Sequence, residues 1–186
     1  MNFNEKEMVK LLRRMNHDFL NHFQVIAGYL QLGRSNQAMA HLKEAVDDVT
    51  ARHNLFRWIY PTAVLLVLSW QLKFFEKAKN LIVQGNTDLQ EISVAEDLLV
   101  DLLSSLLHGM YAISTAAGGE DWLLKVEDRG TDYVFEIEYL GKTAPEYDWS
   151  SVSSKAEGIG CRLEREPEKG TKRLICPKGI SRPGAE

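Results

Sequence analysis

The stretch RRMNHDFLNHFQVIAGYLQL, residues 13–32, predicts a long amphipathic helix. Its apolar side chains continue a stripe that begins upstream, in the steps of three and four residues that place side chains on one face of a helix. Gly33 follows as the expected C-cap, because glycine adopts the left-handed backbone conformation that ends many helices. We therefore predict one helix over residues 4–32, and its stripe consists of Met8, Leu12, Met15, Phe19, Phe23, Ile26 and Leu30.

A second apolar stripe begins a few residues after this helix. Ser35 or Asn36 is the expected N-cap of a second helix, because either side-chain oxygen can accept from the free amides of the first turn. The short connection predicts that the two helices form an antiparallel hairpin. Both stripes are narrow, and two such helices cannot cover their own apolar faces, so we expect a homodimer that forms a four-helix bundle. The second stripe consists of Met39, Leu42, Val46, Val49 and Phe56.

The pattern changes at Tyr60 and Pro61. Proline fits the first turn of a helix but not its interior, and it pushes the residue before it out of the helical conformation. We therefore assign residues 1–59 to the helical hairpin, residues 60–180 to a second domain and residues 181–186 to a flexible tail.

The second domain combines helices with strands that alternate in hydrophobicity. Residues 62–79 and 94–113 carry broad apolar faces that predict helices, and the run NLIVQGN between them predicts a short strand. Two β-hairpins follow, WLLKVED with DYVFEIEYL around RGT, and GCRLERE with KRLICP around PEKG. The expected fold class is α+β, with the N-terminal helical hairpin and a C-terminal α/β sandwich in which the helices lie on the sheet.

Composition narrows the function classes. The chain has 186 residues, a net charge of −4 at pH 7 and no long basic block, which argues against nucleic acid as a partner. No apolar run of the length of a secretory signal starts the sequence, and TAVLLVLSW at residues 62–70 is far shorter than the roughly 20 residues of a membrane span. We therefore expect a cytoplasmic protein with no membrane partner. Cys161 and Cys176 lack the spacing of a metal site and are expected to be buried thiols, so no metal site is predicted.

His17 lies opposite the apolar stripe, at about 100° of rotation per residue, and is expected to face solvent. Many exposed histidines are only solvated surface residues. A neutral imidazole can also attack phosphorus with one ring nitrogen while the other nitrogen keeps its proton, and Asp18 or Asn21 would bias that tautomer. His22 falls on the flank of the stripe, where we expect packing. The histidines that we interpret as structural or surface residues are His41, His53 and His108.

The polar face around His17 suits a docked partner. Gln24 and Gly28 continue this face along the helix. A glycine within a helix gives up helix propensity for a clear surface, on which the backbone of a partner could dock. Basic residues extend the face backwards and could screen the charge of a phosphate, although a solvated helix face explains them equally well. These residues are Lys10, Arg13 and Arg14.

The motif HDFLN, within RRMNHDFLNHFQVIAGYLQLG, resembles the H-box of two-component histidine kinases. More closely, the whole chain resembles the sporulation initiation phosphotransferase B family. That resemblance implies a dimeric helical hairpin followed by a domain shaped like the ATP-binding domain of a kinase. It also implies that His17 accepts a phosphoryl group from the aspartate of one response regulator and passes it to the aspartate of a second, in the control of sporulation initiation. The partners would be receiver domains, which would bring the Mg²⁺.

The second domain lacks the motifs that a working kinase ATP site requires. In LVDLLSSLLHG, Asp101 and Ser105 stand where the kinase family has an asparagine pair that holds Mg²⁺ and phosphates. The aspartate–glycine box expected after FEIEYL is absent from GKTAPEYDWSS, and DRG at residues 128–130 lies in a predicted hairpin turn. The glycine-rich box keeps Gly158 and Gly160 in EGIGC, too weak a signal to cradle phosphate by itself. We therefore expect the chain to bind no cofactor and to use no ATP.

Two other functions stay open on the sequence. Kinases of the citrate-sensor type share the H-box pattern, so the chain could be an ATP-dependent sensor histidine kinase fragment with diverged nucleotide boxes. It could also be a non-catalytic adaptor that binds a receiver domain through its helices. The sequence names neither the two response regulators nor the direction of net phosphoryl flow.

Overall fold

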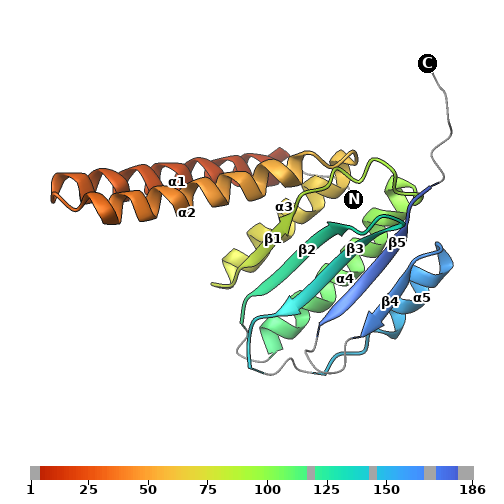
Figure 1. Ribbon diagram of the computed structural model, residues 1–186. Helices are drawn as coiled ribbons and strands as arrows, with labels where there is room; N and C mark the ends of the chain where they lie inside the picture. Colours follow the sequence, from red (N-terminus) through yellow and green to blue (C-terminus); the bar gives the residue numbers. More distant parts are fainter. Residues whose placement is uncertain (1–4, 117–119, 143–145, 166–170, 180–186) are drawn as a thin grey trace, which may run out of the picture. The chain divides into compact units, whose positions relative to one another are not determined.

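The computed structural model describes residues 5–116, 120–142, 146–165 and 171–179 of the chain. The chain forms two compact units, Met1–His53 and Asn54–Glu186 (Figure 1). The first unit is a helical hairpin and the second combines helices with a mixed sheet, so the predicted α+β class is confirmed. The tail predicted to be flexible, residues 181–186, lies outside the described residues.

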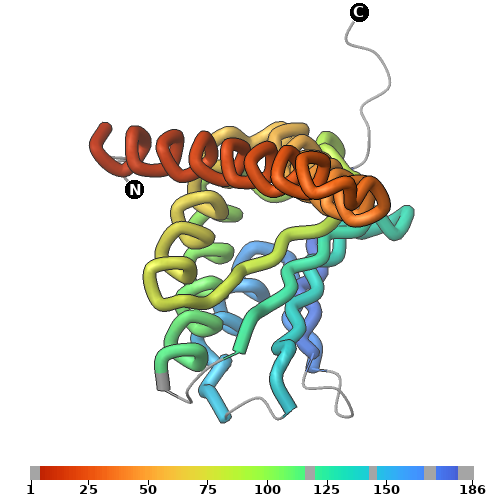
Figure 2. Tube along the Cα trace, turned by 90° about the vertical axis from the view of Figure 1, so that its left-hand side faces the viewer, coloured from red at the N-terminus to blue at the C-terminus, as the bar shows by residue number. Residues whose placement is uncertain are grey.

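Two long helices form the hairpin. α1 spans Glu5–Gln31 and α2 spans Ser35–Phe56, and they run antiparallel, side by side (Figures 1 and 2). Gly33 has a φ of +68°, and the amide of Arg34 donates to the carbonyl of Tyr29 over 2.9 Å, a bond that closes the end of a helix. The predicted glycine C-cap is therefore confirmed.

The start of α2 differs from the prediction. The carbonyl of Arg34 accepts from the amides of Gln37 and Ala38, each over 3.1 Å, so Arg34 is the N-cap residue. The prediction of Ser35 or Asn36 in this position was wrong. The physical reason is the shortness of the turn, because the residue after the glycine is already the N-cap and the helix begins at Ser35.

The last turn of α2 belongs to the second unit. Leu55 and Trp58 are only 3% and 6% exposed, and the Trp58 ring packs edge-on against Phe135 with the ring centroids 5.9 Å apart. The units therefore divide after His53, whereas the sequence pattern placed the boundary after residue 59. The change of pattern at proline marks where α2 has ended, and not where the core of the second unit begins.

Five strands form one sheet in the order β1-β2-β3-β5-β4. β1 pairs with β2 in parallel, and all other neighbouring strands are antiparallel. Both predicted hairpins, β2 with β3 and β4 with β5, are confirmed, although the turn PEKG lies outside the described residues. The strands span Leu81–Gly85 (β1), Trp122–Asp128 (β2), Asp132–Tyr139 (β3), Arg162–Arg165 (β4) and Lys172–Pro177 (β5).

Helices α3, Pro61–Glu76, and α4, Glu96–Ala116, form a layer on one face of the sheet (Figure 2). Proline occupies the first turn of α3, as predicted. The indole N–H of Trp122 on β2 donates to the Ser114 hydroxyl of α4 over 2.8 Å, which ties the two layers together. The broad apolar face predicted for residues 94–113 forms much of the core of this unit, and its buried leucines are Leu99, Leu102, Leu103, Leu106 and Leu107.

One segment in the described part of the chain, Glu96–Thr115 of α4, has the length and composition of a membrane span. More than half of it is buried within the second unit. The apolar side chains of α4 are therefore used as core.

Helix α5, Ser150–Gly158, is not predicted by the sequence pattern. Its sequence SSVSSKAEG is rich in serine, which competes with the helix by bonding to nearby backbone groups. Packing holds this segment in a helix, because Val152 and Ala156 are 3% and 0% exposed. Tertiary contacts decide this element, and local propensity does not.

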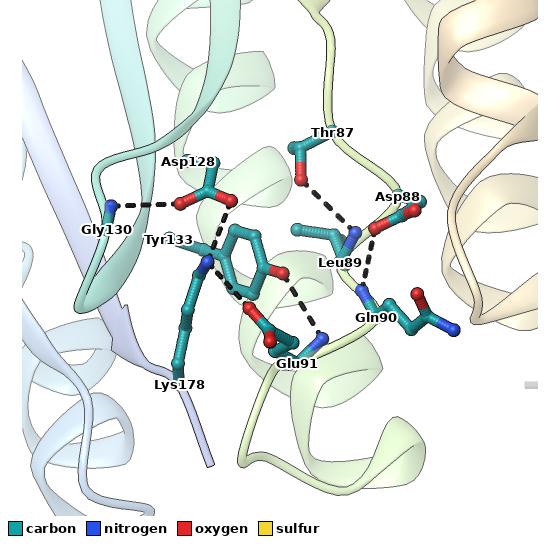
Figure 3. Close-up of polar contacts among 9 residues, drawn as sticks. All are labelled: Thr87, Asp88, Leu89, Gln90, Glu91, Asp128, Gly130, Tyr133 and Lys178. Atoms are coloured by element: carbon teal, nitrogen blue, oxygen red, sulfur yellow. Dashed lines mark hydrogen bonds and ion pairs between the residues drawn. The ribbon is translucent and has the colours of Figure 1, made fainter. Parts of the chain in front are cut away.

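A polar cluster fixes the loop after β1 to the sheet (Figure 3). The Lys178 ammonium donates to Asp128 over 2.8 Å and to Glu91 over 2.9 Å, and it lies 4.8 Å from the ring centre of Tyr133. The bonds to Asp128 and Glu91 raise the pKa of Lys178, while the bonds from Lys178 and the Gly130 amide lower the pKa of Asp128. The charged groups of this cluster satisfy one another, so it acts as a structural clamp.

Candidate functional site

His17 lies near the middle of α1, and its side chain is 71% exposed. It faces solvent, as the helical periodicity predicts. A docked protein can therefore reach the imidazole without any rearrangement of the helix.

Asp18 is the acidic neighbour of this ring. Its Oδ1 atom lies 3.6 Å from Nδ1 of His17 and 3.1 Å from Nη2 of Arg14. The distance to His17 is too long for a hydrogen bond, but a negative charge beside Nδ1 favours a proton on that nitrogen. The lone pair then lies on Nε2, which is the nitrogen available for chemistry.

Asn21 does not share this role in the structure. It is exposed one turn after His17, and among the described residues no side-chain hydrogen bond joins the two. Of the two residues expected to support the ring, only Asp18 lies against it.

The residues predicted to meet a partner lie along the same helix. Gln24 is exposed, and Gly28 is half-buried. A Cβ atom added to Gly28 would meet nothing within 4 Å, so the packing of this chain does not require a glycine there. The basic members are exposed at Lys10 and Arg13, whereas the Arg14 side chain is 31% exposed and bonds Asp18.

A lysine bridges Asp101 and Ser105, the two residues expected to replace the asparagine pair of kinases. The Lys155 ammonium of α5 donates to Asp101 Oδ2 over 2.7 Å and to Ser105 Oγ over 2.9 Å, both on α4. A cation of the chain itself thus neutralises the one carboxylate at these positions. The sequence pattern did not reveal this contact, because α5 itself was not predicted.

The residues expected at the other nucleotide boxes have structural roles in this chain. Gly158 is the last residue of α5, and Gly160 has a φ of +77° in the turn that leads to β4. Tyr147 and Trp149, from the segment in which kinases would have an aspartate–glycine box, lie against α4, and a Cβ added to Gly109 would come within 2.9 Å of both rings. Small residues here serve the packing of the chain on itself.

His22 and His41 form a pair that sequence reasoning missed. Nδ1 of His22 on α1 lies 3.3 Å from Nε2 of His41 on α2, and the ring centroids are 5.2 Å apart. The position of His22 on the flank of the apolar stripe indicated packing, but no local pattern could give its partner on the other helix.

Cys161 and Cys176 are both buried and free, as predicted. A hydrogen bond joins the two thiols, and this bond together with burial raises the pKa of Cys176. Among the described residues, no group of three or more histidine, cysteine or acidic side chains gathers as a metal-binding set.

Comparisons with known proteins agree with the H-box resemblance. Residues 2–58 match the family model described as Sensor_kinase_SpoOB-type, alpha-helical domain. A sensor protein CitS from Halalkalibacterium halodurans is 27% identical, in an alignment that covers 88% of this chain and 33% of the relative. A sensor protein CitS from Bacillus subtilis is 26% identical, in an alignment that covers 72% of this chain and 26% of the relative. The chain thus spans about a third or less of the length of these relatives.

Solved histidine kinases are distant structural neighbours. The Acinetobacter baumannii histidine kinase AdeS is 10% identical, with a TM-score of 0.49, over 89% of this chain and 98% of that chain. Histidine kinase ThkA in complex with the response regulator protein TrrA is 12% identical, with a TM-score of 0.49, over 91% of this chain and 61% of that chain. The chain is therefore similar to the SpoOB-type alpha-helical domain over residues 2–58, and to sensor proteins named CitS over most of its length.

Proposed function

We propose that this chain is a phosphorelay phosphotransferase. It accepts a phosphoryl group from the aspartate of one response regulator onto His17 and passes it to the aspartate of a second response regulator. The observation that carries the proposal is the 71% exposed imidazole of His17, with the Asp18 carboxylate 3.6 Å from its Nδ1 atom. Sporulation initiation as the controlled process is part of the proposal and rests on the family resemblance.

The transfer needs only a positioned nucleophile. Nε2 of His17 attacks the phosphorus of an aspartyl phosphate, and the P–O bond to the aspartate breaks as the P–N bond forms. The aspartate leaves as a carboxylate. The phosphorylated imidazolium keeps its Nδ1 proton, and the negative charge of Asp18 stabilises it. The same steps in reverse at the second regulator return His17 to its neutral form.

Receiver domains of response regulators are the proposed partners, and their acidic pockets would supply Mg²⁺. The contribution of this chain is then the placement of His17 in line with the acyl phosphate. Lys10, Arg13 and Arg14 lie within about two turns before His17, where positive charge would offset repulsion between the acidic pocket and Asp18.

A homodimer is the proposed working form. The stripe of α2 is uncovered in the single chain, since Met39, Leu42 and Val46 are 64%, 39% and 53% exposed. Leu12, Phe23 and Leu30 on α1 are 53%, 64% and 57% exposed. Apolar surface of this extent on two neighbouring helices marks an interaction surface, and a second hairpin would complete a four-helix bundle.

The lysine bridge on α4 supports a reaction that does not use ATP. Mg²⁺ and phosphates at Asp101 and Ser105 would have to displace the Lys155 ammonium, which lies 2.7 Å from the carboxylate. In a kinase these positions would instead have to be available to the metal ion. We therefore propose that the phosphoryl group comes from a protein donor.

An ATP-dependent histidine kinase activity is the second candidate. One observation favours it: the similarity to the sensor proteins named CitS extends over 88% of this chain and is not limited to the hairpin. Incubation of the purified chain with labelled ATP separates the two functions. Label on His17 from ATP alone would replace the phosphotransferase by a kinase.

The decisive experiment starts from a receiver domain that carries labelled aspartyl phosphate. Label is expected to move to the wild-type chain and then to a second receiver domain, and His17→Gln should abolish both transfers. His53→Gln is the matched control, because His53 is also an exposed histidine of the same unit. Transfer between receivers that persists in His17→Gln would leave the chain with the role of a non-catalytic adaptor.

A further inference from the structure

The His22–His41 pair is surrounded by carboxylates on its outer side. His22 Nε2 lies 3.3 Å from Asp48 Oδ2, and His41 Nδ1 lies 3.0 Å from Glu44 Oε2. The two imidazole side chains are 15% and 21% exposed, so they line the seam between α1 and α2 at a depth that solvent still reaches. Each ring thus has one nitrogen that faces an acid and one that faces the other ring.

Counting protons shows that a cation between the rings would let both acids accept an N–H hydrogen bond. A carboxylate only accepts hydrogen bonds, so each outer nitrogen is best occupied by an N–H group. A neutral imidazole has one N–H group, and both inner nitrogens, His22 Nδ1 and His41 Nε2, then carry lone pairs. These lone pairs face each other at 3.3 Å, which is repulsive unless the two nitrogens share a cation.

The spacing of the inner nitrogens fits a metal ion. Two imidazole nitrogens at about 2.0–2.1 Å from a tetrahedral Zn²⁺ ion lie roughly 3.4 Å apart. The distance here is 3.3 Å, close to the separation of two zinc ligands and also within reach of a hydrogen bond between the rings, so the binding experiment must separate the two. Histidine ligands that donate their other N–H group to a carboxylate are the usual arrangement in zinc sites, because the acid fixes the ring and raises its basicity.

Asp48 and Glu44 are both available for that supporting role. Their side chains are 62% and 72% exposed. The neighbouring basic residue, Arg52, donates to the backbone oxygen of Asp48 over 3.4 Å and lies 5.2 Å from the centre of the Phe19 ring. No ion pair joins Arg52 to the Asp48 carboxylate among the described residues.

We propose that His22 and His41 form a binding site for a divalent transition-metal ion of the Zn²⁺ class. Imidazole is a preferred ligand of this class of metal. The described residues supply two ligands, and water or a partner's side chain would complete the coordination. A metal bound here would link α1 to α2 and stabilise the hairpin by mass action. This site does not depend on the proposed phosphoryl transfer, since it uses neither His17 nor Asp18.

Titration of zinc chloride into the tag-free full chain, followed by calorimetry, tests the site. The wild-type chain should bind one Zn²⁺ ion per chain, and Zn²⁺ should raise its unfolding temperature. His22→Gln and His41→Gln should each weaken binding by at least about tenfold and remove the thermal shift. His53→Gln, on the same helix as His41, should bind like the wild type.

A further variant and a folding control complete the test. Asp48→Asn retains both ligands but loses one supporting acid, so an affinity between those of the wild type and His22→Gln is expected. Far-UV circular dichroism of each variant verifies that the helices are intact. Absence of Zn²⁺ binding in the wild type, or equal binding by the wild type, His22→Gln and His41→Gln, would overturn the proposal.

Discussion

The two units of this chain bury their apolar side chains to very different degrees. α1 has 27 residues and none of them is buried, and across residues 5–53 of the described hairpin Ala38 is the one buried side chain. In the second unit, α4 alone places Leu102, Leu103 and Leu106 at 1% exposure or less. The second unit therefore has its own core, whereas the hairpin leaves its apolar surface open.

The difference in burial coincides with a difference in the polar residues that each unit carries. The candidate nucleophile, His17, lies in the unit with the open surface. In the second unit, Lys155 bridges Asp101 and Ser105. Exposed apolar and polar surface on the hairpin suits a region that works through other molecules, and a closed core suits a region that works as a support.

The sharpest way to test the comparison is to truncate an open apolar residue of the hairpin. Phe23 is 64% exposed in the single chain, so Phe23→Ala should hardly change the stability of an isolated monomer. If a second copy covers it, the loss of each buried ring costs about 3–5 kcal/mol. The dissociation constant of the dimer should then rise at least about hundredfold, because each 1.4 kcal/mol is a factor of ten. Sedimentation equilibrium over a dilution series measures it.

Leu98→Ala is the matched control for Phe23→Ala. Leu98 is 45% exposed on α4 of the second unit, so it is also an apolar residue at the surface. Its truncation should leave the oligomeric state unchanged. Equal sedimentation of Phe23→Ala and the wild type would contradict the proposed bundle.

A core truncation in the second unit should have the opposite signature. Leu106 is 0% exposed, and Leu106→Ala should lower the free energy of unfolding of this unit by about 2–5 kcal/mol. Tryptophan fluorescence during denaturation reports it selectively, because Trp58, Trp70, Trp122 and Trp149 all lie in the second unit. The dissociation constant of the dimer should stay unchanged in this variant. A parallel loss of dimer affinity would show that the stability of the second unit and the dimerisation of the hairpin are coupled.

The periodicity of apolar residues predicted the helices and strands whose contacts are local in the sequence. The stripes of residues three and four apart gave both hairpin helices, and alternation gave both β-hairpins, because in each case neighbours in sequence share one face. The same rotation placed His17 on the solvent side of α1. Gly33 was predictable as a C-cap, since the left-handed conformation that it adopts is one that few other residues tolerate.

Contacts between distant segments were not predictable in this way. α5 forms because Val152 and Ala156 are buried, although its serines disfavour a helix. The pairing of His22 with His41 depends on the register between two helices, which the sequence of neither helix contains. Leu55 and Trp58 looked like the end of the hairpin and are core residues of the next unit for the same reason.

The smallest expected effect on stability comes from replacing glycine by alanine, at Gly28 in the hairpin and at Gly158 in the second unit. Added side-chain atoms meet nothing within 4 Å in the chain itself, at Gly28 in α1 and at Gly158 in α5. Gly28→Ala should therefore stabilise α1 by up to about 1 kcal/mol, because alanine favours a helix over glycine. If a receiver domain docks its backbone there, the added methyl group should slow phosphoryl transfer several-fold.

Gly158→Ala is the control and should not slow phosphoryl transfer. Rapid-quench transfer assays and thermal unfolding measure the two quantities separately, and equal transfer rates in both variants would mean that the docking face does not include Gly28.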